Sequence, residues 1–232
     1  MSTNPIIHLR DLSFAFGPSW AIQGIHLDIV PGEFVFLTGP SGAGKTTLLR
    51  LLHGSLPIQK GTALIAGYNL QTLPPKRLHL LRRDVTVVFQ DFMVLPQRSV
   101  RENIALPLVI RNLPRDQIHR RVNAVLRGLQ LESKGQAICG RLSGGEQQRV
   151  AIARSIVVNP KVLLADEPTG NVDPEASMRL LDILDRFNAH GTTIILATHD
   201  QHLLQANVQS RVLHLDQGQL QGVSYAASPS GI

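Results

Sequence analysis

The sequence predicts an α/β fold built on a sheet of mainly parallel strands, and three observations support this prediction. Strand-like and helix-like runs alternate along most of the 232 residues, as they do where helices connect parallel strands. Hydrophobic residues make up 43% of the chain and aromatic residues only 4%, a balance typical of buried aliphatic strands. A glycine-rich loop, Gly39–Thr46, joins an apolar run to a helical one, which is the context of a phosphate-binding loop.

Apolar runs bounded by turn residues predict five strands in the first half of the chain, at Ile6–Leu9, Ala21–Val30, Glu33–Thr38, Thr62–Ala66 and Val85–Phe89. We expect a helix over Lys45–Leu52, because its four leucines form a broad apolar face and Gly54 can end it. The basic stretch Pro75–Arg83 separates the last two strands.

The second half begins with a helical pattern over Ser99–Leu131, broken near Asn112-Leu113-Pro114. This pattern predicts a two-segment helical insertion, which we expect to form a subdomain over about residues 91–158. A further helix follows Ser143 and ends at Asn159-Pro160. Strand and helix then alternate again through Val162–Ala165 and Thr192–Ala197, and the small, polar residues 223–232 predict a flexible tail.

Composition says more about the cellular compartment of the protein than about its function. The N-terminal residues lack the pattern of a signal peptide, and no apolar run approaches membrane-spanning length, so we expect a cytoplasmic protein. The single cysteine, Cys139, agrees with a reducing compartment and predicts a structural role. The net charge of +6 owes much to arginines between residues 77 and 127, which suit nucleic acid, an anionic membrane surface or solvated helix faces.

The glycine-rich loop has the full spacing of a phosphate-binding motif. Its residues are Gly39, Pro40, Ser41, Gly42, Ala43, Gly44, Lys45 and Thr46. Glycines allow backbone N–H groups to turn inward around phosphate oxygens, and the helix N-terminus adds free donors and its positive dipole end. We therefore expect Lys45 to reach the β and γ phosphates and the Thr46 hydroxyl to bind Mg²⁺.

Three polar residues follow strands that are expected to lie beside this loop. Val162–Ala165 runs into Asp166 and Glu167, and open α/β sheets bind ligands at the carboxyl ends of their strands. Asp166 is expected to hold Mg²⁺, and Glu167 to orient or deprotonate the attacking water. His199 follows Thr192–Ala197 and is expected to contact the γ phosphate, while Asp200 can cap the next helix.

Ser143-Gly144-Gly145-Glu146 has the spacing of a capping box, so a helix is expected to start there. The pattern by itself fits either a second anion site or an ordinary capped helix. The longer stretch Leu142–Arg149 resembles the signature motif of ATP-binding cassette (ABC) transporter ATPases. That resemblance favours the first interpretation.

The resemblance extends from about Ile6 to Gly222 and implies a P-loop NTPase of the ABC type. Residues 1–222 are then one nucleotide-binding domain with a RecA-like core, an antiparallel β subdomain and a helical subdomain. Further family positions appear in order: Phe16 for stacking on adenine, Thr47 beside the phosphate loop, Gln90 for the γ phosphate and Mg²⁺, Asn171-Val172-Asp173 as the D-loop, and His199.

The family resemblance also implies partners. ATP would lie between two cassettes arranged head to tail, so that Ser143, Gly144, Gly145 and Glu146 of one copy complete the phosphate loop of another. A homodimer with two equivalent sites is expected. Gln90 would connect the nucleotide to residues 91–110, which receive the membrane partner. The apolar residues Phe92–Leu95 fit either a docking surface or simple burial.

Within the family, three stretches resemble the cell-division ATPases: Phe34–Arg50, Phe89–Phe92 followed by Val100–Leu108, and Ala165–Asn171. This resemblance implies an ATPase that drives an integral membrane protein from the cytoplasmic face of the plasma membrane. ATPases of lipoprotein release or macrolide export remain an alternative. A cassette acting on nucleic acid lacks the long insertion or second cassette expected of it, and a small-molecule kinase would have no reason to keep the signature.

Overall fold

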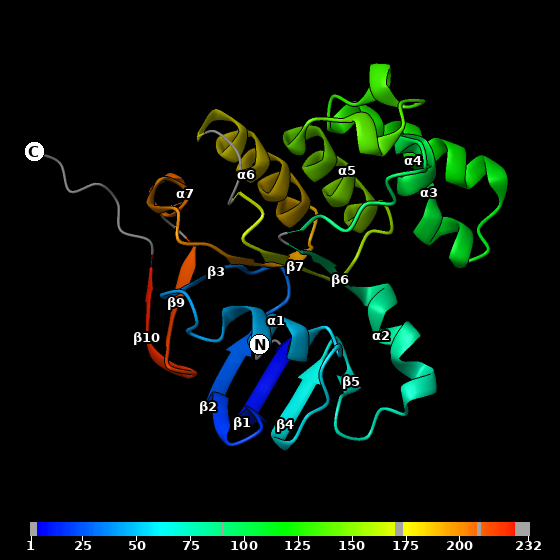
Figure 1. Ribbon diagram of the computed structural model, residues 1–232. Helices are drawn as coiled ribbons and strands as arrows, with labels where there is room; N and C mark the ends of the chain where they lie inside the picture. Colours follow the sequence, from blue (N-terminus) through cyan, green and yellow to red (C-terminus); the bar gives the residue numbers. More distant parts are fainter. Residues whose placement is uncertain (1–3, 90, 170–173, 208–209, 226–232) are drawn as a thin grey trace, which may run out of the picture.

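The computed structural model describes residues 4–89, 91–169, 174–207 and 210–225. A six-stranded sheet in the order β10-β9-β3-β8-β7-β6 divides the molecule into two layers (Figure 1). Its strands are β3 (Phe34–Thr38), β6 (Val85–Val88), β7 (Val162–Asp166), β8 (Thr193–Ala197), β9 (Arg211–Asp216) and β10 (Gln219–Tyr225). All neighbours are parallel except β9 and β10, which agrees with the predicted α/β class.

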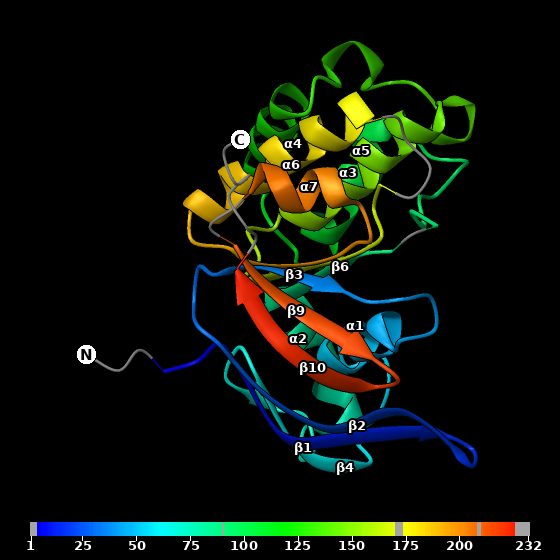
Figure 2. The same ribbon diagram turned by 90° about the vertical axis from the view of Figure 1, so that its left-hand side faces the viewer.

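A second, antiparallel sheet lies below the first. It has the order β2-β1-β4-β5, with β1 (Ile7–Phe16), β2 (Ser19–Ile29), β4 (Lys60–Ile65) and β5 (Tyr68–Asn69). The helices α1 (Lys45–Leu52) and α2 (Leu78–Asp84) lie between the two sheets (Figure 2). The phosphate loop therefore begins a helix that is held between both sheets.

Five helices cover the other face of the parallel sheet (Figure 1): α3 (Val100–Ile110), α4 (Arg115–Gly128), α5 (Gly144–Ile156), α6 (Pro174–Ala189) and α7 (Gln201–Ala206). The break predicted near residue 112 separates α3 from α4. Asn112 has φ 54°, a left-handed conformation that asparagine tolerates, and Pro114 stands at the N-cap of α4.

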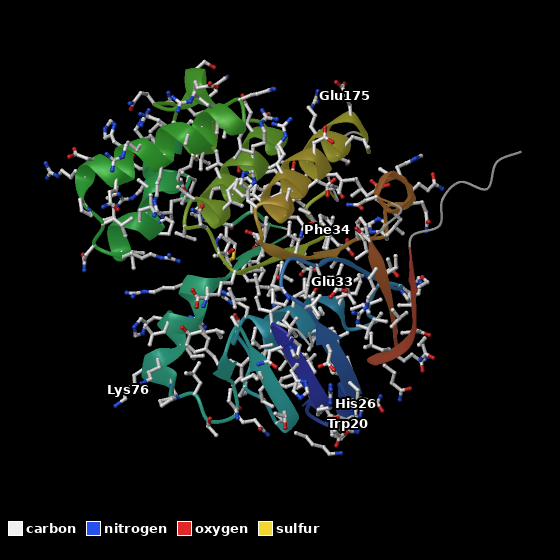
Figure 3. All side chains as sticks on the ribbon, turned by 180° about the vertical axis from the view of Figure 1, so that it is seen from behind. Trp20, His26, Glu33, Phe34, Lys76 and Glu175 are labelled. Carbon is white, nitrogen blue, oxygen red and sulfur yellow. The ribbon has the colours of Figure 1, made fainter. Side chains whose placement is uncertain are left out.

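The side chains of β3 point alternately to the two faces of the parallel sheet, and both faces are buried. Phe34 and Phe36 pack with α3 to α7, whereas Val35 and Leu37 pack with α1 and the antiparallel sheet. Every residue of β3 is buried, as expected for a parallel strand covered on both sides. Figure 3 shows Phe34 at the level of the sheet, with Trp20 and His26 on the antiparallel layer and Glu175 on the helical side.

Several elements differ from the prediction. The strand expected at Ile6–Leu9 continues to Phe16. The polar Arg10-Asp11 pair does not end it but forms a bulge within it, in which Asp11 adopts φ 49°. The tail prediction for residues 223–232 was wrong at its start, since β10 pairs with β9 as far as Tyr225. Residues 226–232 lie outside the described residues. In the described part of the chain, no helix is long and apolar enough to cross a membrane.

The segment after β6 alternates between burial and exposure. Phe92 and Val94 pack against the helical core, while Met93 is 56% and Leu95 37% exposed. Simple burial therefore holds for Phe92 and Val94, and the docking surface stays a prediction for the exposed Met93 and Leu95. Cys139 is fully buried in the same core and accepts a hydrogen bond from Asn103 Nδ2 at 3.1 Å, which agrees with a structural cysteine.

Candidate functional site

Sheet topology brings the three polar strand ends together. β8 lies between β3 and β7, so the carboxyl ends of these parallel strands are adjacent. The Thr198 N–H donates to Leu37 O at 3.2 Å, and the Glu167 N–H donates to Ala197 O at 2.9 Å. The phosphate loop, the Asp166-Glu167 pair and His199 therefore share one edge of the sheet, as the sequence predicted.

The phosphate loop needs glycine at two positions for steric reasons. Gly39 has φ 146°, and a Cβ there would lie 2.0 Å from Leu215 O. Gly44 has φ 107°, and its Cβ would lie 2.6 Å from Ala21 O. Gly44 also caps α1 without any side-chain hydrogen bond, so the first N–H groups of the helix are free to bind an anion.

Lys45 is held inside the loop. Its side chain is only 7% exposed, and Nζ donates to Gly39 O at 2.8 Å and to Pro40 O at 3.1 Å. Nζ also lies 3.5 Å from Glu167 Oε1. A buried ammonium is a suitable partner for phosphate oxygens, which carry the opposite charge.

Asp166 and Thr46 form the candidate metal position. Asp166 is 5% exposed, and this burial raises its pKa, against the opposing effect of a hydrogen bond with Thr46 and the charges of Arg50 and Lys45. A bound divalent cation would favour the ionised carboxylate. A cation held there by these two side chains would complete its shell with water, as Mg²⁺ usually does.

Glu167 is placed between two basic side chains. Its Oε1 faces Lys45, and its Oε2 lies 3.4 Å from His199 Nδ1. The backbone of Glu167 has φ 45°, an uncommon conformation for a residue with a side chain and one that often marks functional sites. His199 itself is 70% exposed, so it can reach a ligand bound above the strand ends.

A cavity of about 450 Å³ surrounds the loop. The described residues that line it are Phe16, Ala21, Ser41, Gly42, Ala43, Gly44, Lys45, Thr46, Thr47 and Glu167. Phe16 is 54% exposed and packs edge-on against Phe14 at a centroid distance of 4.9 Å, which leaves a ring face for stacking. The structure thus places the predicted adenine-stacking residue beside the predicted phosphate loop.

The signature residues do not line this cavity. Ser143 caps α5 and accepts from the Glu146 N–H at 3.4 Å, while Glu146 Oε2 accepts from the Ser143 N–H at 2.9 Å. Glu146 Oε1 also pairs with Lys134 at 3.2 Å, and these contacts lower the pKa of Glu146. Ser143 and Gly144 are exposed, so the start of α5 is accessible and separate from the phosphate cavity.

Two predicted site residues, Gln90 and Asp173, lie outside the described residues. The structure adds a groove of about 750 Å³ that begins at Thr46 and Asp166 and reaches Asp91 and Met93.

Sequence reasoning missed Arg50 and His53, which line this groove. Their position on α1, one and two turns beyond Thr46, was the available signal.

His53 predicts how the stability of the fold depends on pH. It donates to or accepts from Ser55 Oγ at 2.7 Å, and burial, with the charge of Arg82, lowers its pKa from 6.5 to about 4. The unfolded chain therefore binds more protons between these values. Stability from the neutral imidazole is complete above pH 6.5 and is lost as pH falls toward 4, by about 2–3 kcal/mol.

The free energy of unfolding, measured by urea titration across this range, tests the prediction. We expect His53→Gln to flatten the dependence on pH relative to the unchanged chain, whereas the exposed His119→Gln on α4 leaves it unchanged. Identical pH profiles for His53→Gln and the unchanged chain would contradict the effect.

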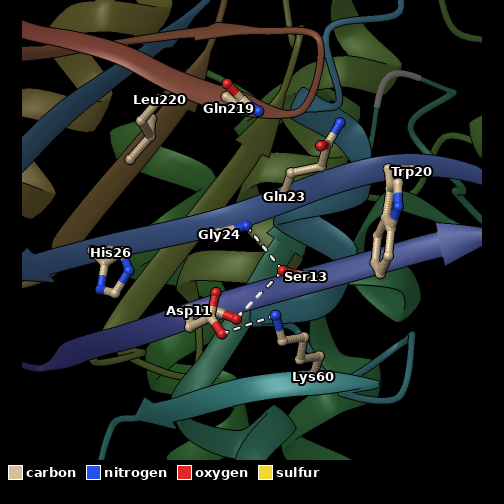
Figure 4. A pocket seen from close by; sticks show the side chains of 9 residues that line it. All are labelled: Asp11, Ser13, Trp20, Gln23, Gly24, His26, Lys60, Gln219 and Leu220. Carbon is tan, nitrogen blue, oxygen red and sulfur yellow. Dashed lines mark hydrogen bonds and ion pairs between the residues drawn. The ribbon is translucent and has the colours of Figure 1, made fainter.

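A further cavity, of about 530 Å³, lies on the antiparallel layer (Figure 4). Trp20, Gln23 and His26 line it, together with an ion pair in which Lys60 Nζ lies 3.1 Å from Asp11 Oδ2. None of the predicted site residues lines this cavity, so it is separate from the phosphate site.

The family model described as ABC transporter matches residues 22–170, which is more than half of the chain. The chain belongs to the ABC transporter family. This ABC cassette is 44% identical over 216 residues to the cell division ATP-binding protein FtsE of Streptococcus pneumoniae serotype 2, covering 93% of the chain and 94% of that relative.

The ABC cassette also matches relatives from other bacteria and solved structures. It is 42% identical to FtsE of Escherichia coli K12, with 94% of this chain and 98% of that protein covered. A dimeric, post-hydrolysis structure of the ATP-binding cassette MJ0796 bound to ADP and Pi superposes with a TM-score of 0.86 at 29% identity, covering 96% of this chain and 99% of that one. Structure and sequence therefore agree on the ABC fold.

Proposed function

We propose that this ABC cassette is the ATP-binding and ATP-hydrolysing subunit of an FtsEX-type complex that acts in cell division. The observation that carries the proposal is the separation of the two half-sites: the phosphate loop lines one cavity, and the exposed Ser143-Gly144 start of α5 lies outside it. The 42–44% identity to several FtsE proteins over most of the chain supports the cell-division assignment.

Two copies would then form a homodimer in which each signature closes the other copy's phosphate loop. The free N-terminus of α5 presents backbone donors and a positive dipole end to the nucleotide. Because Glu146 is engaged in the capping box and with Lys134, its part in this proposal is to hold Ser143 in place. The dimeric MJ0796 structures supply the solved precedent for paired cassettes.

Hydrolysis follows from the arrangement around Glu167. Lys45 and the N–H groups of the loop hold the β and γ phosphates. Thr46 and Asp166, with Gln90, would hold Mg²⁺, which neutralises phosphate charge when bound. Glu167 accepts a proton from the water that attacks the γ phosphorus, and His199 steadies the γ phosphate.

The contact between Lys45 and Glu167 adds a step to this proposal. With Nζ 3.5 Å from the carboxylate, the ammonium holds the base in an ion pair while the phosphate site is empty. Arrival of the γ phosphate draws Lys45 toward a stronger anionic partner. Glu167 is then released from its ion pair with Lys45, and is free to act as the base, only when the substrate is in place.

An FtsX-like integral membrane protein is the proposed partner, which would hold the cassette peripherally on the cytoplasmic face of the plasma membrane. The groove from Asp166 to Met93 connects the nucleotide site with the exposed Met93 side chain. Movement of residues 91–110 would thus transmit the nucleotide state. Exposed arginines on α2 and α4 suit an anionic membrane surface beside that partner.

Isolation of the cassette with its native membrane subunit tests the proposal. We expect an FtsX-like protein to be recovered. Recovery of a lipoprotein-extracting or macrolide-exporting subunit would replace the cell-division assignment, and ATP-dependent, salt-sensitive binding to nucleic acid without a membrane subunit would overturn it.

A further inference from the structure

A cavity separate from the nucleotide site lies between the end of α4 and the helices α5 and α6. It encloses about 330 Å³, which is at the lower end of the range for small-molecule sites. α5 contributes Gln148, Arg149 and Ile152 to its wall. No residue of the phosphate loop lines it.

Two residues that line this cavity each have a buried side-chain nitrogen without a hydrogen-bond partner. In the described part of the chain, four buried side-chain polar atoms have none, and two of these, Gln148 Nε2 and Arg149 Nε, belong to residues that line the cavity. Gln148 is only 3% exposed. An unsatisfied buried donor destabilises the fold, and native proteins normally satisfy such groups. Both atoms are donors, so a ligand that satisfies them must present acceptor oxygens.

Charge at the cavity favours an anion. Arg149 on α5 and Arg179 and Arg186 on α6 line it, against one acidic side chain, Asp182. Arg179 also pairs with Glu175 at 2.6 Å, so three arginines against the two carboxylates Asp182 and Glu175 leave one positive charge. Asp182 stands three residues after Arg179 and four before Arg186, so both arginines are its neighbours on the surface of α6.

The rest of the wall is apolar. Leu129, Ile152 and Leu180 line the cavity and are each less than 5% exposed. Such a wall favours a ligand with an apolar body behind its charged group. Polar donors and apolar surface thus occur in one small enclosure.

We propose that this cavity binds a small organic oxyanion, a carboxylate or phosphate ester on an apolar body. Its oxygens accept hydrogen bonds from Gln148 Nε2 and Arg149 Nε once these two side chains turn toward the cavity, while Arg179 and Arg186 supply positive charge. Because Gln148 lies five residues after Ser143 on the helix that carries the signature, a bound anion connects that helix with α6.

NMR spectroscopy of the full chain tests the proposal, because the Arg149 Nε–H and Gln148 NH₂ groups are directly observable. The chain is saturated with ADP and Mg²⁺, so that the phosphate loop is occupied. Phenyl phosphate and benzoate are titrated separately to millimolar concentrations, with benzyl alcohol as the neutral match. We expect both side-chain resonances to shift with at least one anion and not with the alcohol, and the tighter anion identifies the ligand class.

Three variants separate a specific site from general charge. Gln148→Leu is expected to weaken binding by about tenfold or more and to fold, since it removes a buried unsatisfied group. Arg179→Gln removes a positive charge at the cavity and is expected to weaken binding. Arg120 is exposed on α4, and Arg120→Gln is expected to leave binding unchanged. Unshifted Arg149 and Gln148 resonances, equal binding of benzyl alcohol, or unchanged binding by both Gln148→Leu and Arg179→Gln would overturn the proposal.

Discussion

Glu167→Gln is expected to lower ATP turnover by about a hundredfold or more while ATP binding is retained. Glutamine has the size of glutamate but cannot accept the proton from the attacking water. Oε1 and Oε2 of Glu167 face Lys45 and His199 at 3.5 and 3.4 Å, so the change also removes a negative charge beside the phosphate site. The variant should therefore accumulate as an ATP-bound dimer.

Steady-state phosphate release and size-exclusion chromatography with ATP measure the two effects. Glu175→Gln is the matched control, because Glu175 is an exposed carboxylate on α6 that pairs with Arg179 at 2.6 Å and does not line the phosphate cavity. Unchanged turnover in Glu167→Gln would remove this residue from the role of base.

Ser143→Arg has the second large expected effect, the loss of ATP-dependent dimers with near-normal ATP binding to the monomer. Ser143 lies outside the phosphate cavity, so nucleotide affinity of a single chain does not depend on it. A long cationic side chain at the exposed start of α5 would occupy the place of the partner's nucleotide. Hydrolysis should fall with the dimer.

The effect of losing the helix cap must be separated from the effect of losing the contact between Ser143 and the partner's nucleotide. Ser143 caps α5, and replacing such a cap costs about 1 kcal/mol. Ser143→Asn keeps a capping side chain and is the control for helix stability by circular dichroism. Dimers that still form in Ser143→Arg on addition of ATP would count against a shared site.

Local sequence signals determined much of the candidate site. The glycine spacing of Gly39–Thr46, and carboxylates directly after an apolar strand, predicted residues that the structure places at one sheet edge. The helix Lys45–Leu52 has the predicted bounds, because its apolar face and Gly54 act locally. The strand order that brings β8 between β3 and β7 depends on long-range pairing, which these local patterns do not specify.

The missed elements have identifiable physical causes. The bulge at Asp11 interrupted the alternation of β1, so only its first part was predicted. The hairpin of β9 and β10 has a two-residue turn, Gln217-Gly218, with φ 45° and 76°, a usable turn signal that was not used. The ion pair between Lys45 and Glu167 and the unpartnered donors of the α5 to α6 cavity depend on side-chain packing between distant segments, which has no short sequence pattern.

A mixing experiment tests the shared, head-to-tail site most directly. Lys45→Ala and Ser143→Arg chains, each also carrying Glu167→Gln, are labelled separately and mixed with ATP. Each variant alone should stay monomeric, because every site contains a defect. In the mixture, the intact loop of the Ser143→Arg chain meets the intact signature of the Lys45→Ala chain, so one complete site forms and mixed dimers appear. A mixture that stays as monomeric as its two components would contradict the shared site.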